Sequence, residues 1–254
     1  MYNWGFWPIG LVIRSKVYII YILRSSVLRI SVIIPTLNEA IALPATLSAV
    51  TALDGLQELI VADGGSTDDT RTLAAPLAKV ICTEAGRGGQ QAAGAALATG
   101  DVLWFLHADC TPDPGATRAI RAALADPTVA GGNFAVRFGG SGRAARRLTR
   151  AYPWFRLLGL CYGDSGIFVR RESYEAVGGF RPLPLFEDID LVRRIRRRGR
   201  FRRVACGLTA SSRRFEHRNL AGVFAQWTGL QILYWLGVSP SWLARRYAPV
   251  RERS

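Results

Sequence analysis

Residues 103–111 read Leu-Trp-Phe-Leu-His-Ala-Asp-Cys-Thr, an apolar run that ends at a carboxylate, Asp109, two residues after an imidazole, His107. A short apolar run that ends at polar residues is typical of a buried strand. In open α/β sheets, ligands bind just beyond the carboxyl ends of the strands. The stretch therefore predicts a strand whose end places a metal-capable pair at the mouth of a sheet.

A second junction between a strand and an acid stands upstream. Residues 59–66 read Leu-Ile-Val-Ala-Asp-Gly-Gly-Ser, so another apolar run ends at a carboxylate, Asp63. Two such junctions in one chain favour a nucleotide site over a solvated turn.

Strand and helix patterns alternate along the chain. We expect strands over residues 30–34, 59–62, 80–83, 102–106, 130–138 and 165–169. We expect helices over 40–53, 88–99, 115–125, 143–160 and 187–198, and a further helix capped by residues 66–69. This alternation predicts an α/β fold, with a mostly parallel sheet covered by helices on both faces.

The composition limits the class of protein. A chain of 254 residues, 49% of them hydrophobic, suits one α/β domain with additions at its ends. The net charge of +14 favours anionic partners such as phosphates or an acidic membrane face, with a merely basic surface as the alternative. The four cysteines form no Cys-x-x-Cys pair, which favours free thiols in a reducing cytoplasm.

Both ends of the chain differ from its middle. We assign residues 1–28 to an N-terminal extension, 29–215 to the main domain and 216–254 to a C-terminal helical segment. The apolar runs of the extension fall short of the roughly 20 residues of a membrane-spanning helix. An interfacial anchor, an edge strand and sequence upstream of the true start remain open for it. Residues 220–244 carry no charge and predict two short helices that dock on the domain or lie in a membrane interface.

Asp63 and Asp109 are candidate binding residues. Gly64 lets the backbone approach a ligand closely, and the Asp63 carboxylate can accept hydrogen bonds from a base or ribose, although Asp-Gly-Gly-Ser is also ordinary turn chemistry. Asp109 offers oxygen to Mg²⁺ or Mn²⁺, which often combine one or two carboxylates with substrate phosphates. His107 suits Mn²⁺ better than Mg²⁺, and it could instead contact a phosphate or ribose.

Three acids, Glu187, Asp188 and Asp190, open a predicted helix, where acids also compensate the helix dipole. Their functional interpretation is a general base, a role that only one of them needs. Arg87 precedes a helix among glycines and is a candidate phosphate contact. The arginines between residues 193 and 203 are interpreted as a solvated or membrane-facing surface.

Four segments, in this order, resemble the family 2 glycosyltransferases, an inverting class with the GT-A fold. They are 31–39 (SVIIPTLNE), 61–68 (VADGGSTD), 106–109 (LHAD) and 186–188 (FED). The resemblance covers roughly residues 29–215. Residues 236–240 (LGVSP) resemble the final segment of small bacterial single-domain members.

The resemblance implies a role for each matching residue. Asp188 would be the catalytic base, Asp109 would ligate the metal on the diphosphate, and Asp63 would hold a uracil-type base. His107 stands where the family's Asp-x-Asp motif has its first acid, and it is a second candidate metal ligand. Together with the candidates drawn from the residues themselves, the expected contacts to the nucleotide sugar are Pro35, Thr36, Glu39, Asp63, Gly64, Arg87, His107, Asp164 and Glu187.

The implied reaction moves one sugar, with inversion, from a nucleoside-diphosphate sugar of the UDP type to a hydroxyl acceptor, with Mg²⁺ or Mn²⁺ as cofactor. The Gln-x-x-Arg-Trp signature of processive members is absent, which favours single transfer. A lipid-linked acceptor and peripheral membrane contact are hypotheses that the hydrophobic, basic C-terminus motivates. The expected location is the cytoplasm or the inner face of the plasma membrane.

Two other functions remain open. A nucleotidyltransferase would carry a Gly-rich loop where this chain has residues 35–39, and P-loop chemistry is excluded because its motif is absent. A non-catalytic basic module for nucleic acid or membranes is the second alternative. No recognised nucleic-acid motif occurs, so we expect no nucleic-acid partner.

Overall fold

The computed structural model describes residues 28–139, 146, 149–150, 163–211 and 220–247. Nearly all of the N-terminal extension, most of the predicted helix over 143–160 and the start of the C-terminal segment lie outside these residues. The assignments made for them, and the domain boundaries, stay predictions.

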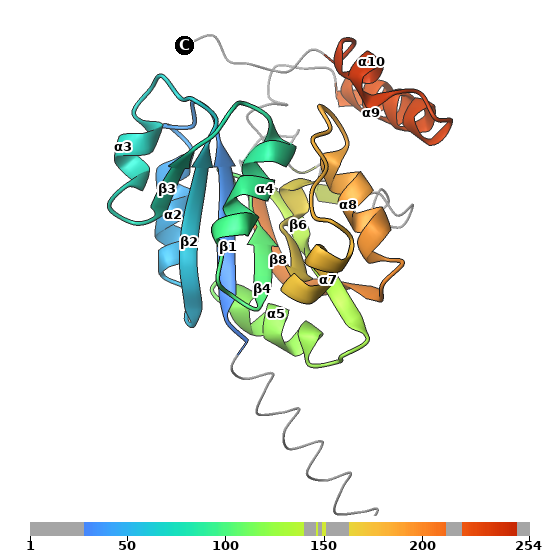
Figure 1. Ribbon diagram of the computed structural model, residues 1–254. Coiled ribbons are helices and arrows are strands. Elements are labelled where there is room, and N and C mark those ends of the chain that lie inside the picture. Colours follow the sequence, from blue (N-terminus) through green and yellow to red (C-terminus); the bar gives the residue numbers. More distant parts are fainter. Residues whose placement is uncertain (1–27, 140–145, 147–148, 151–162, 212–219, 248–254) are drawn as a thin grey trace, which may run out of the picture.

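The elements of the described residues follow one another as strands and helices in near alternation (Figure 1). In chain order they are β1 (Ile30–Thr36), α2 (Leu43–Thr51), β2 (Leu56–Asp63), α3 (Thr70–Ala74), β3 (Lys79–Cys82), α4 (Arg87–Leu97), β4 (Val102–Phe105), β5 (Cys110–Pro112), α5 (Ala116–Leu124), β6 (Val129–Gly139), the 3₁₀ turn η1 (Gly163–Ser165), β7 (Ile167–Arg170), α7 (Arg171–Ala176), α8 (Glu187–Ile195), β8 (Arg200–Ser211), α9 (Leu220–Trp235) and α10 (Pro240–Ala244).

Within the described residues the strands form one eight-stranded sheet, in the order β3-β2-β1-β4-β7-β6-β8-β5. The first four are parallel, as are β6 and β8. β7 runs antiparallel to both of its neighbours, and β5 runs antiparallel to β8. The predicted α/β fold with a mostly parallel sheet is confirmed, with an antiparallel strand inserted near its middle.

Helices cover both faces of this sheet, because the side chains of each strand alternate between the two faces. Val32 and Ile34 of β1 face a core cluster that includes residues of α2 and α5. Ile33 faces the opposite cluster, which includes residues of α4, α7 and α8. Figure 1 shows the same layering, with α4, α7 and α8 in front of the strands. The predicted two-sided cover is confirmed.

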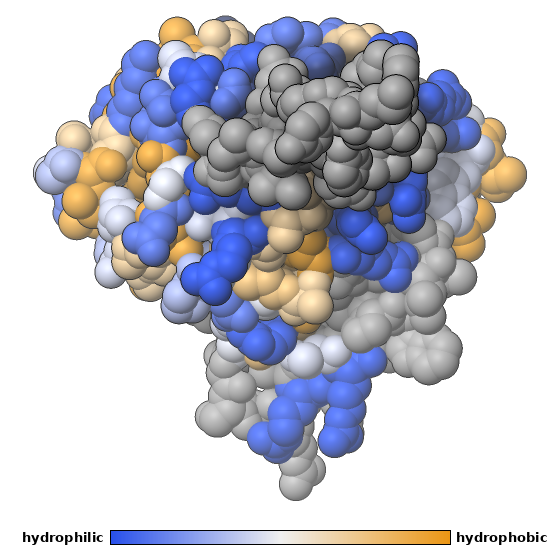
Figure 2. Space-filling model, turned by 90° about the horizontal axis from the view of Figure 1, so that it is seen from below, coloured by the Kyte–Doolittle hydropathy of each residue, from blue (hydrophilic) through white to orange (hydrophobic). Residues whose placement is uncertain are grey.

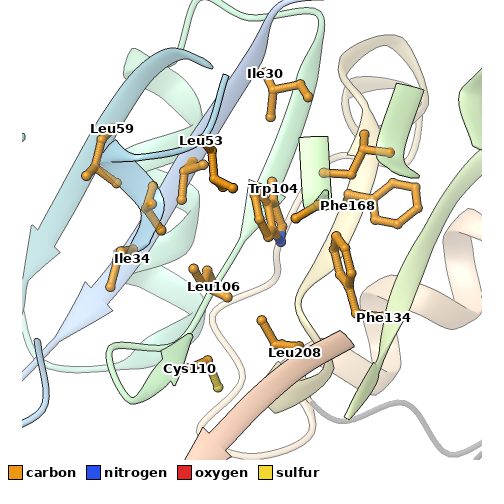
Figure 3. Close-up of a cluster of buried hydrophobic side chains, with 14 of the residues drawn as sticks. Ile30, Ile34, Leu53, Leu59, Trp104, Leu106, Cys110, Phe134, Phe168 and Leu208 are labelled. Carbon is orange, nitrogen blue, oxygen red and sulfur yellow. The ribbon is translucent and has the colours of Figure 1, made fainter. Parts of the chain in front are cut away.

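The first cluster contains a group of aromatic rings where β4, β6 and β7 adjoin (Figure 3). Trp104 stacks on Phe134 with ring centroids 5.2 Å apart, and Phe134 meets Phe168 edge-on at 5.7 Å. Aromatic pairs of this kind add to the free energy gained by burying their area. They fix β4, which precedes the turn carrying Asp109, and β7, which follows the turn carrying Asp164.

The segment from residue 200 to 211 differs from the expectation. It forms β8, twelve residues paired with β6 and β5, whereas the sequence pattern indicates only a surface for its arginines. Both descriptions hold for its first half, where Arg200, Arg202 and Arg203 are exposed while their backbone pairs with β6. Long arginine side chains can keep their charge in water while their backbone pairs in a strand, so a run of arginines does not show the alternating pattern from which a strand is predicted. The short elements β5 and α7 are also absent from the sequence-based prediction.

The two predicted C-terminal helices, α9 and α10, dock on the domain. Leu230 and Leu243 pack with Leu185, Phe186 and Ile189, the residues around the start of α8 (Figure 1). Among the described residues, no helix combines the length and the apolar content needed to cross a bilayer.

Candidate functional site

The carboxyl ends of β1, β2 and β4 meet at one end of the sheet. Thr36 pairs in register with Asp63, and Ile33 pairs with Phe105, so the turn after Phe105 lies level with the ends of the other two strands. This is the position at which open α/β sheets bind ligands. The two strand-to-acid junctions of the sequence therefore belong to one site.

Asp63 is fully buried at the end of β2. Its carboxylate accepts hydrogen bonds from the Thr36 hydroxyl (3.1 Å), the Ser66 hydroxyl and the backbone amides of Gly65 (3.0 Å) and Ser66 (2.8 Å). Burial alone would raise the pKa of Asp63, but these hydrogen bonds outweigh burial and lower it below the ordinary value. The carboxylate is therefore a fixed negative charge at the base of the site.

Hydrogen bonds join the two loops that follow β1 and β2. The Asn38 amide donates to the Ser66 hydroxyl, and the Asn38 side chain accepts from the Thr67 amide, both at 2.8 Å. The Glu39 amide donates to the Thr70 hydroxyl at 2.8 Å. Asn38 takes a left-handed conformation (φ 55°), which asparagine adopts more readily than most residues. Sequence reasoning named Glu39 but missed Asn38, Ser66 and Thr70.

Gln90 of α4 was also missed. Its buried side-chain amide donates to the carbonyls of Thr36 and Ala62, both at 2.7 Å, and accepts from the Gly86 amide at 3.3 Å. One side chain thus braces the ends of β1 and β2 and the loop before α4. A Cβ at Gly64 would lie 3.0 Å from this amide, so glycine permits the close approach of the Gln90 side chain here, and the predicted approach to a ligand stays a prediction.

Pro35 and Thr36, which the family resemblance places at the nucleotide, are buried within β1. The Thr36 hydroxyl is committed to Asp63. In this structure Pro35 and Thr36 form part of the buried base of the site, while the half-buried Glu39 lies in the loop that follows β1.

Asp109 and His107 flank the turn that follows β4, and both are partly exposed. The thiol of Cys110 lies 3.7 Å from the Asp109 carboxylate and 3.6 Å from the carbonyl of Asp164, so the η1 turn adjoins this acid. Within the described part of the chain, no group of three or more His, Cys, Asp or Glu side chains could hold a metal ion. A carboxylate and an imidazole on one turn suit a cation that takes its other ligands from a phosphate substrate and water.

The three acids of α8 have different surroundings. Glu187 is buried and paired with Arg87, Nε to Oε1, at 2.9 Å. Asp190 is buried and bound by Arg194 at 2.6 Å and by Arg181 at 3.5 Å. Asp188, between them, is partly exposed. Exposure thus distinguishes Asp188 from Glu187 and Asp190, which are both buried.

Phe186, directly before these acids, has a left-handed backbone (φ 65°), a strained conformation for an aromatic residue. Its ring packs against Tyr234 of α9 with centroids 5.0 Å apart. The strained turn that presents Asp188 is therefore covered by the C-terminal helices.

Arg87 connects the two sides of the site. Glu187, followed by Asp188, Tyr247 and Asp164, raises the pKa of Arg87 above its ordinary value, so this guanidinium is charged among these groups. Its side chain is still 45% exposed. Behind it, a Cβ at Gly88 would meet the Arg181 carbonyl at 2.8 Å, so glycine permits the close approach of α4 to the segment that precedes α8. The structure brings Arg87, Asp164, Glu187 and Asp188 together.

The arginines beyond α8 do not join this site. A cavity of about 730 Å³ is lined by Arg196, Arg198, Arg200 and Arg203 together with Thr128, Gly199 and Phe201. It lies at the start of β8, which pairs with the start of β6 at the end of the sheet opposite to Asp63. Figure 2 views the molecule from below and shows the hydrophilic side chains spread over this face.

Of the four cysteines, the three in the described residues are free thiols, as expected.

Comparison with known proteins gives a consistent result. The family model for glycosyl transferase family 2 matches residues 31–178, more than half of the chain. Uncharacterized glycosyltransferases of Mycobacterium bovis and Mycobacterium tuberculosis are 39% identical over 88 residues, which is 34% of this chain and 39% of theirs. The match therefore spans about two fifths of the length of these relatives.

Two solved structures share the fold at identities that show the fold alone. Glucosyl-3-phosphoglycerate synthase from M. tuberculosis, in complex with Mn²⁺, UDP and glucosyl-3-phosphoglycerate, has a TM-score of 0.58 and 22% identity, covering 89% of this chain and 82% of that one. S. aureus TarS 1-349 in complex with UDP has a TM-score of 0.58 and 17% identity, covering 72% and 60%. With the GT-A-like sheet and the family match over residues 31–178, the chain belongs to glycosyl transferase family 2.

Proposed function

We propose that this enzyme transfers one sugar, with inversion, from a UDP-type nucleotide sugar to a hydroxyl acceptor. The observation that carries the proposal is the convergence of Asp63, Asp109, Arg87 and Asp188 at one end of the sheet. These residues offer a contact for the nucleoside, a ligand for a metal, a cation for the diphosphate and a base for the acceptor.

The donor would occupy the ends of β1, β2 and β4. The buried charge of Asp63 would attract the hydrogen-bond donors of a base held at the exposed loop around Gly65, and the preference for uracil follows the family. The two structural neighbours in complex with UDP support this choice. Asp164 of η1 and the loop at Glu39 would contact the sugar and the ribose.

Asp109 and His107 would hold Mn²⁺ or Mg²⁺ together with the donor diphosphate. The bound cation supplies positive charge that offsets the charge of the diphosphate as it leaves. Mn²⁺ is the better fit because an imidazole stands beside the single carboxylate. The complex of the mycobacterial synthase contains the same ion, which supports this choice.

Arg87 would bind the diphosphate from the opposite side. In this structure Glu187 occupies it at 2.9 Å, and a diphosphate would compete with that carboxylate. Arginine forms charge-assisted, often bidentate hydrogen bonds with phosphate as it does with carboxylate, so a diphosphate can replace Glu187 as its partner. Glu187 would thus hold Arg87 in position until the donor arrives.

Asp188 would act as the general base. It would take the proton of the acceptor hydroxyl as the acceptor oxygen bonds to the anomeric carbon. The bond from that carbon to the diphosphate oxygen breaks in the same step, and its electron pair leaves with the diphosphate. A single displacement inverts the anomeric centre and needs no covalent nucleophile. We further propose a hexose as the sugar, a lipid-linked hydroxyl as the acceptor and the inner face of the plasma membrane as the location.

Reaction stereochemistry tests this function. The protein is incubated with Mn²⁺, a lipid extract and α-linked UDP-hexoses, and the first sugar product is followed by proton NMR. A β-linked product, absent without donor or metal, is the expected result. A retained α-linkage, or no release of UDP from any donor, would refute it.

A further inference from the structure

The exposed hydrophobic side chains of the described residues are concentrated at the end of α9. Eight large hydrophobic residues of the described part of the chain are exposed, and four of them fall within five consecutive positions: Ile232, Leu233, Trp235 and Leu236. Trp235 is 52% and Leu236 76% exposed. Scattered exposed hydrophobics are ordinary, but a contiguous group of this kind marks an interaction surface.

The group occupies one side of the helix. At 100° per residue, positions 232, 233, 235 and 236 span one arc, whereas Leu230, Gln231 and Tyr234 fall on the opposite arc. Leu230 and Gln231 are buried, and Tyr234 packs on Phe186. The helix therefore uses one side to dock on α8 and turns the other, apolar side outward. We call these four outward residues the α9 apolar edge.

The charge around the α9 apolar edge is positive. Arg245 and Arg246 follow α10 and are exposed, and Arg246 lies 3.4 Å from the centre of the Trp242 ring. Arg193, Arg181 and Arg194 act electrostatically on Tyr234, which lies in the last turn of α9 on the side that docks on α8. Asp190 also acts there, but Arg194 and Arg181 pair with it. Residues 220–247 contain no acidic side chain at all.

We propose that the α9 apolar edge seats this enzyme on an anionic lipid bilayer. Aliphatic and tryptophan side chains would enter the boundary between headgroups and acyl chains, and the flanking arginines would meet the lipid phosphates. A second copy of the chain fits less well, because it would bring arginines against arginines in a protein of net charge +14. α9 has 16 residues, which suits a helix lying in the interface.

The helix that carries the α9 apolar edge adjoins the acceptor side of the site. α9 and α10 pack on Leu185, Phe186 and Ile189, which surround Asp188, and Tyr247 beyond α10 acts on Arg87. A bilayer bound here would present lipid-borne hydroxyls beside the proposed base. This consequence rests on the proposed function, whereas the binding of the bilayer itself does not.

Sedimentation with vesicles tests the surface in the full-length protein. Vesicles contain phosphatidylcholine alone or mixed in equal parts with phosphatidylglycerol. We compare the wild type with Trp235→Glu/Leu236→Glu and with the control Leu77→Glu/Leu97→Glu, whose original side chains are 49% and 43% exposed elsewhere. The first variant should lose about tenfold or more in affinity for the anionic vesicles, and the control should lose far less despite the same change in charge.

Two further measurements separate the possible outcomes. Circular dichroism and UDP titration show whether each variant keeps its fold and donor site. Equal loss in both variants, or undiminished sedimentation of Trp235→Glu/Leu236→Glu, would overturn the proposal. So would a wild-type dimer in gel filtration that this variant abolishes. Vesicle binding that depends on the α9 apolar edge in a protein without affinity for UDP would support the surface and refute the proposed reaction.

Discussion

Asp63 at the end of β2 and Asp188 at the start of α8 lie on the donor and acceptor sides of one site, and they are positioned by different means. Asp63 is fixed by hydrogen bonds from Thr36 at the end of β1 and from Gly65 and Ser66 in the loop after β2. Asp188 follows the strained Phe186, whose ring packs on α9 from far along the chain. The donor side is built by polar contacts among the ends of neighbouring strands and their loops, and the acceptor side by hydrophobic packing and ion pairs.

The comparison predicts the largest effect at Asp188. Asp188→Ala should lower kcat by about 10²–10⁴-fold, the usual contribution of a general base, and leave UDP affinity unchanged. Steady-state kinetics and calorimetry measure the two quantities. Asp54→Ala, at an exposed turn, is the control and should retain activity. Retained transfer by Asp188→Ala would remove this residue from its role.

Asp63→Asn should act on stability and donor binding together. Replacing the buried acceptor leaves its donors poorly paired, at a cost of about 1–3 kcal/mol in the free energy of unfolding. Because the pKa of Asp63 is lowered when folded, its contribution is present above the ordinary pKa of 3.8 and is lost as pH falls through the folded value. Denaturation of both proteins as a function of pH should show the difference shrinking below about pH 4. A difference that grows on acidification would contradict this account.

Gln90→Leu tests whether the donor side is braced as a unit. The change strands the carbonyls of Thr36 and Ala62, so we expect a loss of about 1–2 kcal/mol in stability and a weaker affinity for UDP. Gln57→Leu, on the exposed side of β2, is the matched control and should cost less than about 0.5 kcal/mol. Equal effects of the two substitutions would show that the hydrogen bonds of Gln90 to β1 and β2 contribute neither to stability nor to UDP binding.

The smallest expected effect concerns the ion pair that links the two sides. If a diphosphate takes Arg87 from Glu187, Arg87→Gln should weaken UDP binding about threefold to tenfold, since a charge-assisted contact is lost. Glu187→Gln should instead leave UDP binding equal or slightly tighter, because Arg87 no longer has a competing partner. Calorimetry of both variants is the measurement. A similar loss of affinity in both would make the pair purely structural.

The donor side was the more predictable from sequence, and the reason is local. The β-branched run at residues 30–34 and the junction at Asp63 carry their own periodicity and turn residues. The parts that were missed depend on distant partners. Gln90 lies in an Ala-rich helix, and its partners are carbonyls 54 and 28 positions away, which no local pattern reveals.

The acceptor side was predicted in composition but not in arrangement. Three acids in one helical turn are indistinguishable in sequence until Arg87 and Arg194 are placed beside Glu187 and Asp190. The left-handed turn at Phe186 could not be predicted from sequence, because no glycine or asparagine stands there. Packing of the Phe186 ring against α9 accounts for it. Tertiary contacts, rather than propensity, decide these features.

Calorimetric titration of UDP, GDP and CDP, with and without Mn²⁺, into the wild type and Asp109→Ala tests the central claim most directly. We predict binding of UDP that requires Mn²⁺ and is lost in Asp109→Ala, while thermal unfolding of the variant stays close to that of the wild type. Failure of all three nucleotides to bind, or UDP binding unchanged by both Mn²⁺ and the substitution, would contradict a metal-assisted donor site at this end of the sheet.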